Sequence, residues 1–397
     1  MTLLSKRLEL MTESATLEMA RKSRELKAKG IDIISLSLGE PDFNTPDFIK
    51  EAAKKAIDEN FTKYPPVNGY LDLREAIAHK FKRDNHLNYT ADNIVVSTGA
   101  KQSIINAVMS LVNEGDEVII PTPFWVSYEE MVKLAGGKCV FINATIEHDF
   151  KITSTQLEAA ITPKTKLMIF SSPCNPTGSV YTQQELEALA QVLKKHKNIY
   201  VISDEIYEHI NFTGKHASIA AVEGMFDNVI TVNGVSKAFC MTGWRIGFIG
   251  ASKQIATACN KLQGQFTSGA SSIAQRASLA AMQADPKVVE PMREAFLKRR
   301  DLVLNLLKDV PGMVCNVPTG AFYVFPKVNS FFGKSFNEKK ISNAEELCLF
   351  LLEDAKVALV TGEAFGDPNC VRISYATGEA ELTEAMKRIK HSLAKLA

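Results

Sequence analysis

The sequence has no strong excess of charge of either sign. Its 397 residues include 46 Lys and Arg against 45 Asp and Glu, which gives a formal net charge of +1. A protein that binds nucleic acid needs a surplus of basic residues on one face to neutralise phosphates. The balance therefore argues against a nucleic-acid-binding protein and favours small molecules as partners.

Long apolar runs are also missing. No stretch approaches the roughly 18 apolar residues that a membrane span requires. The first 30 residues mix charges throughout and do not contain the apolar core of a signal peptide. We therefore expect a soluble, cytoplasmic protein with no membrane partner.

Cysteine and histidine are few and scattered. The seven cysteines are odd in number and form no C-x-x-C pair, which favours free buried thiols over disulfide bonds or zinc ligands. The seven histidines show no H-E-x-x-H or other metal-ligand spacing. The sequence therefore predicts no metal site.

What is present suits a globular α/β protein. Hydrophobic residues make up 46% of the chain, and the 22 glycines and 15 prolines are too few for a collagen-like or disordered chain. Between residues 93 and 251, seven short apolar runs alternate with amphipathic stretches. Runs such as LMIF (167–170) are apolar at consecutive positions, which is typical of strands covered on both faces. We expect a mostly parallel seven-stranded sheet flanked by helices.

The pattern changes after Pro291. A long helical stretch, two short strand-like pieces and a terminal amphipathic helix follow, which together indicate a smaller α+β unit. The helix expected at residues 15–29 and the strand-like run after it are predicted to join this unit. We therefore divide the chain into an N-terminal arm with part of the small domain (1–45), a large domain (46–290) and a C-terminal small domain (291–397).

Side chains that can bind ligands or take part in reactions follow the predicted strands. In a doubly wound sheet, ligands bind beyond the carboxyl ends of the strands. A glycine turn at Gly99 opens the helix after the first strand, and free backbone N–H groups at such a turn can hold an anion. Residues after later strands are Asn175, Asp204, Tyr207, Ser236, Lys237 and Arg245.

Each of these features has an ordinary explanation when taken alone. A glycine between a strand and a helix is common, Asn175 could build a turn, Asp204 could cap a helix, and Lys237 could lie on the surface. Together they supply what pyridoxal phosphate requires, namely a lysine for a Schiff base, an anion for the ring nitrogen, donors for the ring oxygen and a phosphate pocket. The combination predicts a pyridoxal 5'-phosphate site.

The chain also resembles the fold-type I, class I aminotransferases of the aspartate aminotransferase family over about residues 5–395. The strings that carry the resemblance are LGEPDF (38–43), YPPVNGYLDLREAIA (64–78), STGAKQ (97–102), PTPFWVSY (121–128), SPCNPTG (172–178), SDEIYEHI (203–210), VSKAFCMTGWRIGF (235–248), PTGAFYVF (318–325) and VRISYA (371–376). The resemblance implies ping-pong transamination of L-aspartate and 2-oxoglutarate to oxaloacetate and L-glutamate.

The resemblance implies catalytic and cofactor-binding roles for the strand-end residues. Lys237 would form the Schiff base and then shuttle a proton, while Asp204 would keep the ring nitrogen protonated. Tyr207 and Asn175 would donate to the ring oxygen, and Trp125 would stack on the ring. The implied phosphate ligands are Ser236, Arg245, the backbone of Gly99, Ala100 and Lys101, and Tyr64 from the partner of a homodimer.

Substrate recognition is implied in the same way. Arg372 would hold the α-carboxylate with its planar guanidinium, together with Gly39, Trp125 and Asn175. The ordinary alternative for Arg372 is an exposed arginine at a strand end. Lys101 is the cation expected to meet the distal carboxylate of aspartate. Two other candidates by charge, Arg299 and Arg300, fall in the middle of a predicted helix.

Alternative functions stay open on the same scaffold. Relatives that accept prephenate have a lysine after the methionine of the string resembling LELMTES, and this chain has Thr12 there, which argues against prephenate activity. Specificity for aromatic donors is another alternative, and a pyridoxal-phosphate lyase or decarboxylase would share the same electron sink. A transcription regulator with an aminotransferase-like domain is disfavoured, because only about 12 residues precede the first family-like helix and no DNA-binding module fits there.

Overall fold

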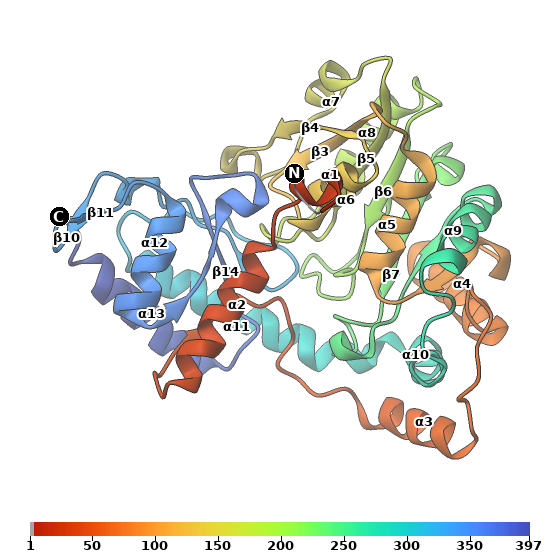
Figure 1. Cartoon of the computed structure of the whole chain (residues 1–397), viewed down its shortest axis with the longest axis horizontal. Helices are drawn as coiled ribbons and strands as arrows, with labels where there is room; N and C mark the ends of the chain where they lie inside the picture. Colours follow the sequence, from red (N-terminus) through yellow and green to blue (C-terminus); the bar gives the residue numbers. More distant parts are fainter. Residues whose placement is uncertain (1–3) are drawn as a thin grey trace.

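The computed structural model describes residues 4–397 and is built around a central seven-stranded sheet (Figure 1). In spatial order the strands are β2 (Ile94–Ser97), β8 (Gly247–Gly250), β7 (Val229–Gly234), β6 (Tyr200–Asp204), β5 (Thr165–Ser171), β3 (Glu117–Thr122) and β4 (Lys138–Asn143). Among these seven, β8 alone runs against the others, since it pairs antiparallel with β2 and β7. The predicted α/β fold with a mostly parallel seven-stranded sheet is confirmed.

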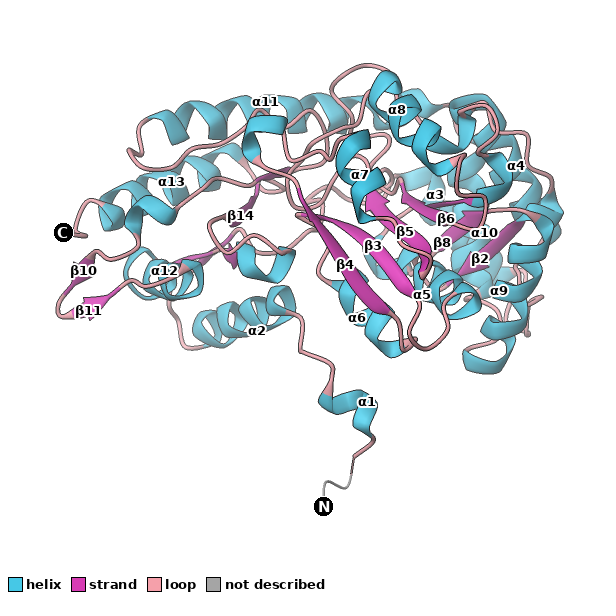
Figure 2. Ribbon diagram, turned by 90° about the horizontal axis from the view of Figure 1, so that it is seen from above, coloured by secondary structure: helices cyan, strands magenta, loops and turns pink. Residues whose placement is uncertain are grey.

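Helices cover both faces of this sheet (Figure 2). One face packs against α5 (Ala100–Leu111), α6 (Ser127–Leu134) and α9 (Lys253–Phe266), and the other against α4 (Leu71–Asn85), α8 (Gln183–Leu193) and α10 (Ser272–Gln283). In β3, Val118 and Ile120 join the first core while Ile119 joins the second. Successive strand residues point to opposite faces, so burial on both sides explains the consecutive apolar runs. Two further helices, α3 (Asp47–Asp58) and α7 (Ser154–Ala160), pack against α10 and α8.

Both ends of the chain build a second, smaller region beside the sheet. Its helices are α2 (Ala15–Ala28), α11 (Glu290–Lys308), α12 (Ala344–Phe350) and α13 (Glu379–Leu393), and a short α1 (Lys6–Glu9) precedes them. Its strands are β1 (Ile34–Ser35), β9 (Tyr323–Val324), β10 (Ser335–Phe336), β11 (Lys339–Lys340), β12 (Val357–Ala358), β13 (Val360–Thr361) and β14 (Val371–Ser374). Strand β1 pairs in parallel with β12, which ties the N-terminal segment to the C-terminal part of the chain. The predicted smaller α+β unit from both termini is therefore present, while its exact boundaries stay a prediction.

Two local expectations differ from the structure. The run expected as a strand from residue 31 to 43 forms only β1, because residues 38–43 leave the sheet and extend to the pocket described below. Residues 205–209 form turns and no helix, so Asp204 is not a helix cap. Its carboxylate instead accepts a hydrogen bond from the hydroxyl of Tyr128, which is distant in the sequence.

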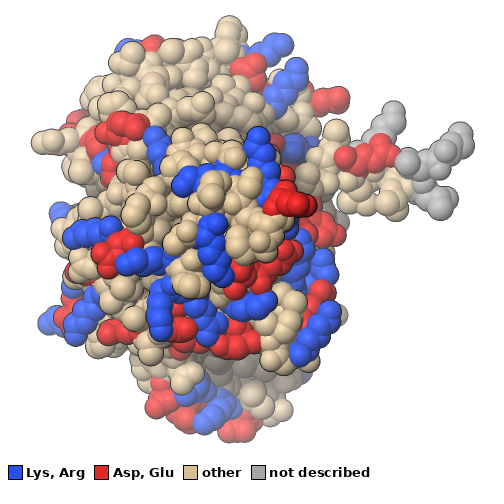
Figure 3. Space-filling model, turned by 90° about the vertical axis from the view of Figure 1, so that its left-hand side faces the viewer, with Lys and Arg blue, Asp and Glu red and all other residues tan. Residues whose placement is uncertain are grey.

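The surface and the thiols follow the composition. Basic and acidic side chains are interspersed on the face that carries α13 and the C-terminus (Figure 3), which fits the net charge of +1. All seven cysteines are free, and four of them are buried. Within residues 4–397, no helix combines the length and the apolar character needed to cross a membrane.

Candidate active site

A pocket of about 410 Å³ lies beyond the carboxyl ends of β5, β6 and β7, where ligands bind in doubly wound sheets. Its walls come from both regions, since β9 and β14 also contribute side chains. The predicted site residues that line it are Gly39, Ala100, Lys101, Trp125, Asn175, Asp204, Tyr207, Ser236, Lys237, Arg245 and Arg372. Of the residues predicted for the site, Gly99 and Tyr64 are absent from the lining. The structure thus gathers residues from along most of the sequence around one cavity.

Lys237 follows β7 and reaches into the centre of the pocket. Its Nζ donates a hydrogen bond of 2.5 Å to the carbonyl oxygen of Gly39 and lies 5.7 Å from the ring centroid of Tyr207. Burial, which penalises the ammonium form, lowers the pKa of Lys237 to about 8, and the charges of Arg372 and Arg245 contribute to this lowering. An amine with this pKa has a substantial neutral, nucleophilic fraction near neutral pH.

Asp204 is the last residue of β6, and its carboxylate is buried at the pocket wall. Its Oδ2 accepts a hydrogen bond of 2.8 Å from the hydroxyl of Tyr128, and its Oδ1 accepts one of 3.3 Å from the N–H of Ile206. Burial raises the pKa of Asp204 to about 6, against the opposing effects of these two hydrogen bonds. A buried carboxylate of this kind is compensated best by a cation in the pocket.

Arg372 is buried in β14, with 2% of its surface exposed. Its Nη1 donates to Oδ1 of Asn175 at 2.9 Å and its Nη2 donates to the carbonyl of Ser37 at 2.5 Å. The guanidinium also lies 4.6 Å and 4.8 Å from the ring centroids of Tyr323 and Phe365. The alternative of an exposed strand-end arginine is therefore wrong.

The charge of Arg372 is not balanced by an acidic side chain. No carboxylate forms an ion pair with it among residues 4–397, and its Nε has no hydrogen-bond partner there. Burial lowers the pKa of Arg372. A buried guanidinium without a protein carboxylate is suited to bind a carboxylate that arrives with a ligand.

The start of α5 forms an anion-binding corner with Arg245. Gly99 precedes the helix at φ 83°, and a Cβ there would lie 2.4 Å from Nη2 of Arg245, so both the backbone and the space require glycine. The first intrahelical bond runs from the N–H of Gln102 to the carbonyl of Gly99, which leaves the preceding N–H groups of Ala100 and Lys101 available. Gly99 therefore does not line the pocket itself, but its lack of a side chain leaves room for Arg245 at this corner.

Lys101 lies exposed in the same helical turn and lines the pocket, at its edge rather than on a buried floor. Its Nζ lies 5.0 Å from the ring centroid of Trp125. Partial shielding and the charge of Arg245 lower the pKa of Lys101. Its competitor Arg299 is engaged elsewhere, because it forms two hydrogen bonds of 2.6 and 2.9 Å with Asp42.

Several lining residues were not singled out from the sequence. Ser14 and Thr16, at the start of α2, face the pocket, and Ser14 makes no side-chain cap bond to its own helix. Tyr128 and Tyr323 also line it. Both tyrosines lie inside strings that the sequence analysis quoted, PTPFWVSY and PTGAFYVF, so position within those strings was the available signal.

Tyr64 and Thr12 lie outside the pocket lining, as Gly99 does. Tyr64 is 98% exposed on the surface. Thr12 is bonded to Glu130, whose carboxylate accepts from the Thr12 N–H at 3.1 Å and from its hydroxyl at 3.0 Å. The side chain of Thr12 is therefore held against α6, away from the pocket lining.

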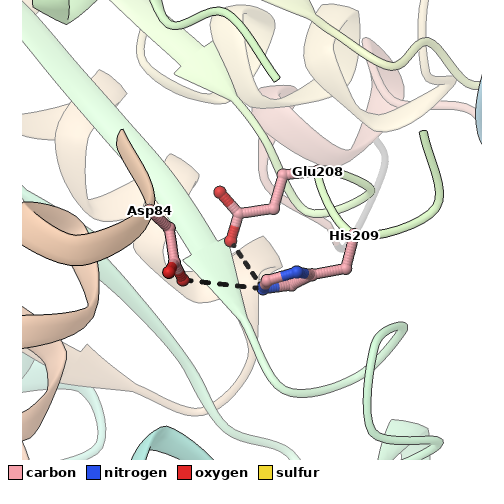
Figure 4. A group of neighbouring side chains, drawn as sticks. All are labelled: Asp84, Glu208 and His209. Carbon is pink, nitrogen blue, oxygen red and sulfur yellow. Dashed lines mark ion pairs between the residues drawn. The ribbon is translucent and has the colours of Figure 1, made fainter. Parts of the chain in front are cut away.

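Asp84, Glu208 and His209 form a compact polar cluster behind the site (Figure 4). Nε2 of His209 lies 3.1 Å from Glu208 and 4.0 Å from Asp84. The buried ammonium of Lys80 pairs with Glu208 and donates to Asn85 at 2.7 Å. A protein cation thus already compensates the carboxylate charge, and we assign this cluster no metal-binding role.

Comparison with known proteins agrees with this geometry. The family model described as aminotransferase class I and II matches residues 31–389. A probable aspartate/prephenate aminotransferase of Rhizobium leguminosarum bv. phaseoli is 48% identical over 394 residues, which cover 98% of each chain. A bifunctional aspartate aminotransferase and glutamate/aspartate-prephenate aminotransferase of Petunia hybrida is 46% identical over 98% of this chain and 82% of its own length.

Solved structures agree as well. The crystal structure of an aspartate aminotransferase from Rhizobium meliloti matches with a TM-score of 0.96 and 42% identity, covering 100% of both chains. The aspartate aminotransferase of Thermus thermophilus with maleate matches with a TM-score of 0.93 and 40% identity, covering 99% of this chain and 100% of that one. With a family match over most of its length and full-length relatives at this identity, the chain belongs to the class I and II aminotransferase family and is an aminotransferase.

Proposed function

We propose that the protein is a pyridoxal 5'-phosphate-dependent aspartate aminotransferase, which converts L-aspartate and 2-oxoglutarate into oxaloacetate and L-glutamate by a ping-pong cycle. The observation that carries the proposal is the presence, besides Lys237 and Arg245, of two further basic side chains in one pocket. Arg372 is buried without an acidic partner among the described residues, and Lys101 lies at the edge of the same cavity. A dicarboxylate is the ligand class that satisfies both charges.

The donor set fits pyridoxal phosphate. The buried carboxylate of Asp204, with a pKa of about 6, is largely ionised at pH 7 and would favour a protonated ring nitrogen. Tyr207 supplies a hydroxyl, and Asn175 has its NH₂ group free to donate because its Oδ1 already accepts from Arg372. The ring of Trp125 provides a surface for stacking. When bound, the cofactor supplies an electron sink that stabilises negative charge at the α-carbon.

The phosphate group fits the corner at α5. Arg245 lies against Gly99 at this corner, and Ser236 lines the same pocket, so a guanidinium, a helix N-terminus and a hydroxyl are available to a phosphate. Glu40, which also lines the pocket, accepts a hydrogen bond from the hydroxyl of Thr242.

Lys237 has two tasks in this proposal. It would hold the cofactor through Nζ, and its neutral amine would be the group that accepts the α-proton of the substrate and later gives it back. The lowered pKa of about 8 supports both tasks, because each requires the uncharged amine. The carbonyl of Gly39 holds Nζ at the centre of the pocket.

A homodimer and a cytoplasmic location are also part of the proposal. Tyr64 is 98% exposed, and Phe266, from the segment that packs near Pro65, is 67% exposed. Large exposed aromatic side chains of this kind are typical of subunit interfaces. In such a dimer, Tyr64 would reach the phosphate corner of the partner subunit.

Aspartate/prephenate specificity is the second candidate, because the relatives from Rhizobium leguminosarum bv. phaseoli and Petunia hybrida carry prephenate in their names. The bonds of Thr12 to Glu130 weigh against it. A panel of amino donors with 2-oxoglutarate, and of acceptors including prephenate, separates the two. The proposal predicts oxaloacetate and glutamate as products, and formation of pyruvate or ammonia instead would favour a lyase.

The cofactor assignment is tested by borohydride reduction and peptide mapping. The pyridoxyl group is expected on Lys237, and Lys237→Ala should lose the reducible adduct. A label on a different lysine would overturn the site assignment, even if the protein proved to be a transaminase.

A further inference from the structure

Tyr323 connects two parts of the pocket that have separate roles in the proposed function. It lies in β9 of the smaller region, is fully buried, and lines the cavity. Its hydroxyl lies 2.7 Å from the hydroxyl of Tyr207. Its ring centroid lies 4.6 Å from the guanidinium carbon of Arg372. Tyr323 therefore contacts both Tyr207, the proposed donor to the ring oxygen, and Arg372, the proposed ligand of the α-carboxylate.

The contact with Arg372 is built into the sheet. Strand β9 pairs antiparallel with β14, and Tyr323 lies opposite Ser374. Arg372 is two residues from Ser374, so it is a diagonal neighbour of Tyr323 on the same face of the sheet. Phe365 stands 4.8 Å from the same guanidinium. The two rings and two hydrogen bonds thus fix the orientation of Arg372.

The absence of a side chain at Gly39 leaves room for the hydroxyl of Tyr323. A Cβ at Gly39 would lie 2.1 Å from this oxygen. Residue 39 must therefore lack a side chain for the hydroxyl to reach Tyr207. The carbonyl of the same glycine accepts from Lys237, so the tyrosine pair lies directly beside the reactive amine.

A phenol has one proton to donate and two lone pairs that can accept. If Tyr323 donates to the oxygen of Tyr207, the proton of Tyr207 is left to point into the pocket. A donor that itself accepts a hydrogen bond is also polarised and becomes a stronger donor. The direction of the bond between the two hydroxyls thus decides what Tyr207 offers to a ligand.

We propose that Tyr323 is a positioning residue, whose hydroxyl directs the proton of Tyr207 toward the ring oxygen of the cofactor and whose ring orients Arg372 for the α-carboxylate. This inference rests on the proposed function, because it concerns bound pyridoxal phosphate. It assigns two separable tasks to one side chain. A role limited to core packing would need only the volume of the ring.

Tyr323→Phe tests the first task, because it removes the hydroxyl and keeps the ring. In the holoenzyme, the pH midpoint of the absorbance change of the bound cofactor should rise by about 0.4 to 1 unit, the size of one hydrogen bond between neutral groups. The rise is expected because a weaker donor stabilises the ionised ring oxygen less. Binding of succinate, a dicarboxylate without an amino group, should change less than about twofold, since the ring still lies against Arg372.

Tyr323→Leu tests the second task. It removes the ring from Arg372, so the dissociation constant for succinate should rise about fivefold to tenfold, in addition to the shift of the absorbance midpoint. Tyr375→Phe is the matched control. Its hydroxyl is fully buried in the same region but donates to the carbonyl of Ala321 and is absent from the pocket lining, so both measurements should stay at the wild-type values.

A double-mutant cycle with Tyr207→Phe distinguishes action through Tyr207 from a general effect. Tyr323→Phe should add no further shift once the Tyr207 hydroxyl is gone. The inference is overturned if Tyr323→Phe binds the cofactor and keeps the wild-type midpoint within about 0.1 unit, or if Tyr375→Phe shifts it equally. Failure of the proposed function would look different, because the wild-type protein itself would then bind no pyridoxal phosphate.

Discussion

The pKa of Lys237 is open to direct measurement in the apoprotein. Burial lowers it to about 8, whereas an unperturbed lysine titrates near 10.4. At pH 7 the neutral fraction is therefore about one in eleven, compared with about one in 2,500 for an ordinary lysine. The neutral form of Lys237 is thus about 200-fold more populated at pH 7 than that of an ordinary lysine. A reagent that attacks only neutral amines should label Lys237 faster in that proportion.

Competitive labelling with trace acetic anhydride, followed by peptide mass spectrometry, gives the titration curve of each lysine. We expect a midpoint near pH 8 for Lys237, with the exposed Lys164 as the internal reference. The apoprotein is required because the cofactor would block the amine. A midpoint at or above about pH 10 would refute the argument from burial and would remove the support for Lys237 as a base near neutral pH.

The same shift affects stability. For a base whose folded pKa lies below its unfolded value, the penalty on folding is complete below the folded pKa and disappears as the pH rises through the unfolded pKa. Lys237→Met should therefore make the apoprotein more stable to urea at pH 7, by roughly 1–3 kcal/mol. The difference from wild type should shrink between about pH 8 and pH 10.4. A variant that is less stable at every pH would show that the ammonium is better compensated than its contacts indicate.

Three further substitutions test other parts of the site. Lys101→Ser should lower kcat/KM for aspartate roughly tenfold and leave kcat/KM for phenylalanine unaffected. The factor is small because an exposed charge contributes a free energy at the lower end of the range for charge-assisted hydrogen bonds. Equal losses for both donors would refute the role of Lys101 in specificity. Gly99→Ala should weaken binding of pyridoxal phosphate, measured by dialysis and absorbance, whereas Gly30→Ala, with a similar φ of 80° but open space around it, should keep it. Lys80→Met should lower the free energy of unfolding by about 3–5 kcal/mol in urea, because it removes the ammonium that pairs with the buried Glu208, and a loss below about 1 kcal/mol would contradict that account.

The sheet was predictable because burial on both faces leaves a direct record in the sequence. Val118, Ile119 and Ile120 are apolar at consecutive positions for that reason. Gly99 was predictable as well, since a turn with positive φ at a helix start restricts the residue type. Features that depend on strand ends and turns could therefore be derived locally.

Other parts of the site depend on contacts between distant segments, which no local pattern encodes. The composition of the loop that carries Gly39 predicts a strand, but in the structure the loop lies at the pocket, where the Gly39 carbonyl accepts a hydrogen bond from Lys237 and the hydroxyl of Tyr323 lies close by. Ser14 and Thr16 become pocket residues only because α2 packs beside the cavity. Nothing in their own neighbourhood in the sequence distinguishes them from ordinary residues at a helix start.

The side chains of the turn after β6 face two different environments. Asp204 and Tyr207 face the pocket, whereas Glu205 and Glu208 face a buried set of charges that includes Lys80. A substitution that shifts the backbone of this turn would therefore disturb both environments at once. Lys101, which we propose to meet the distal carboxylate of the substrate, belongs to α5 and lies outside this turn. Under the proposed function, a change of the side chain at position 101 can therefore alter the preferred amino donor and leave Asp204 and Tyr207 in place.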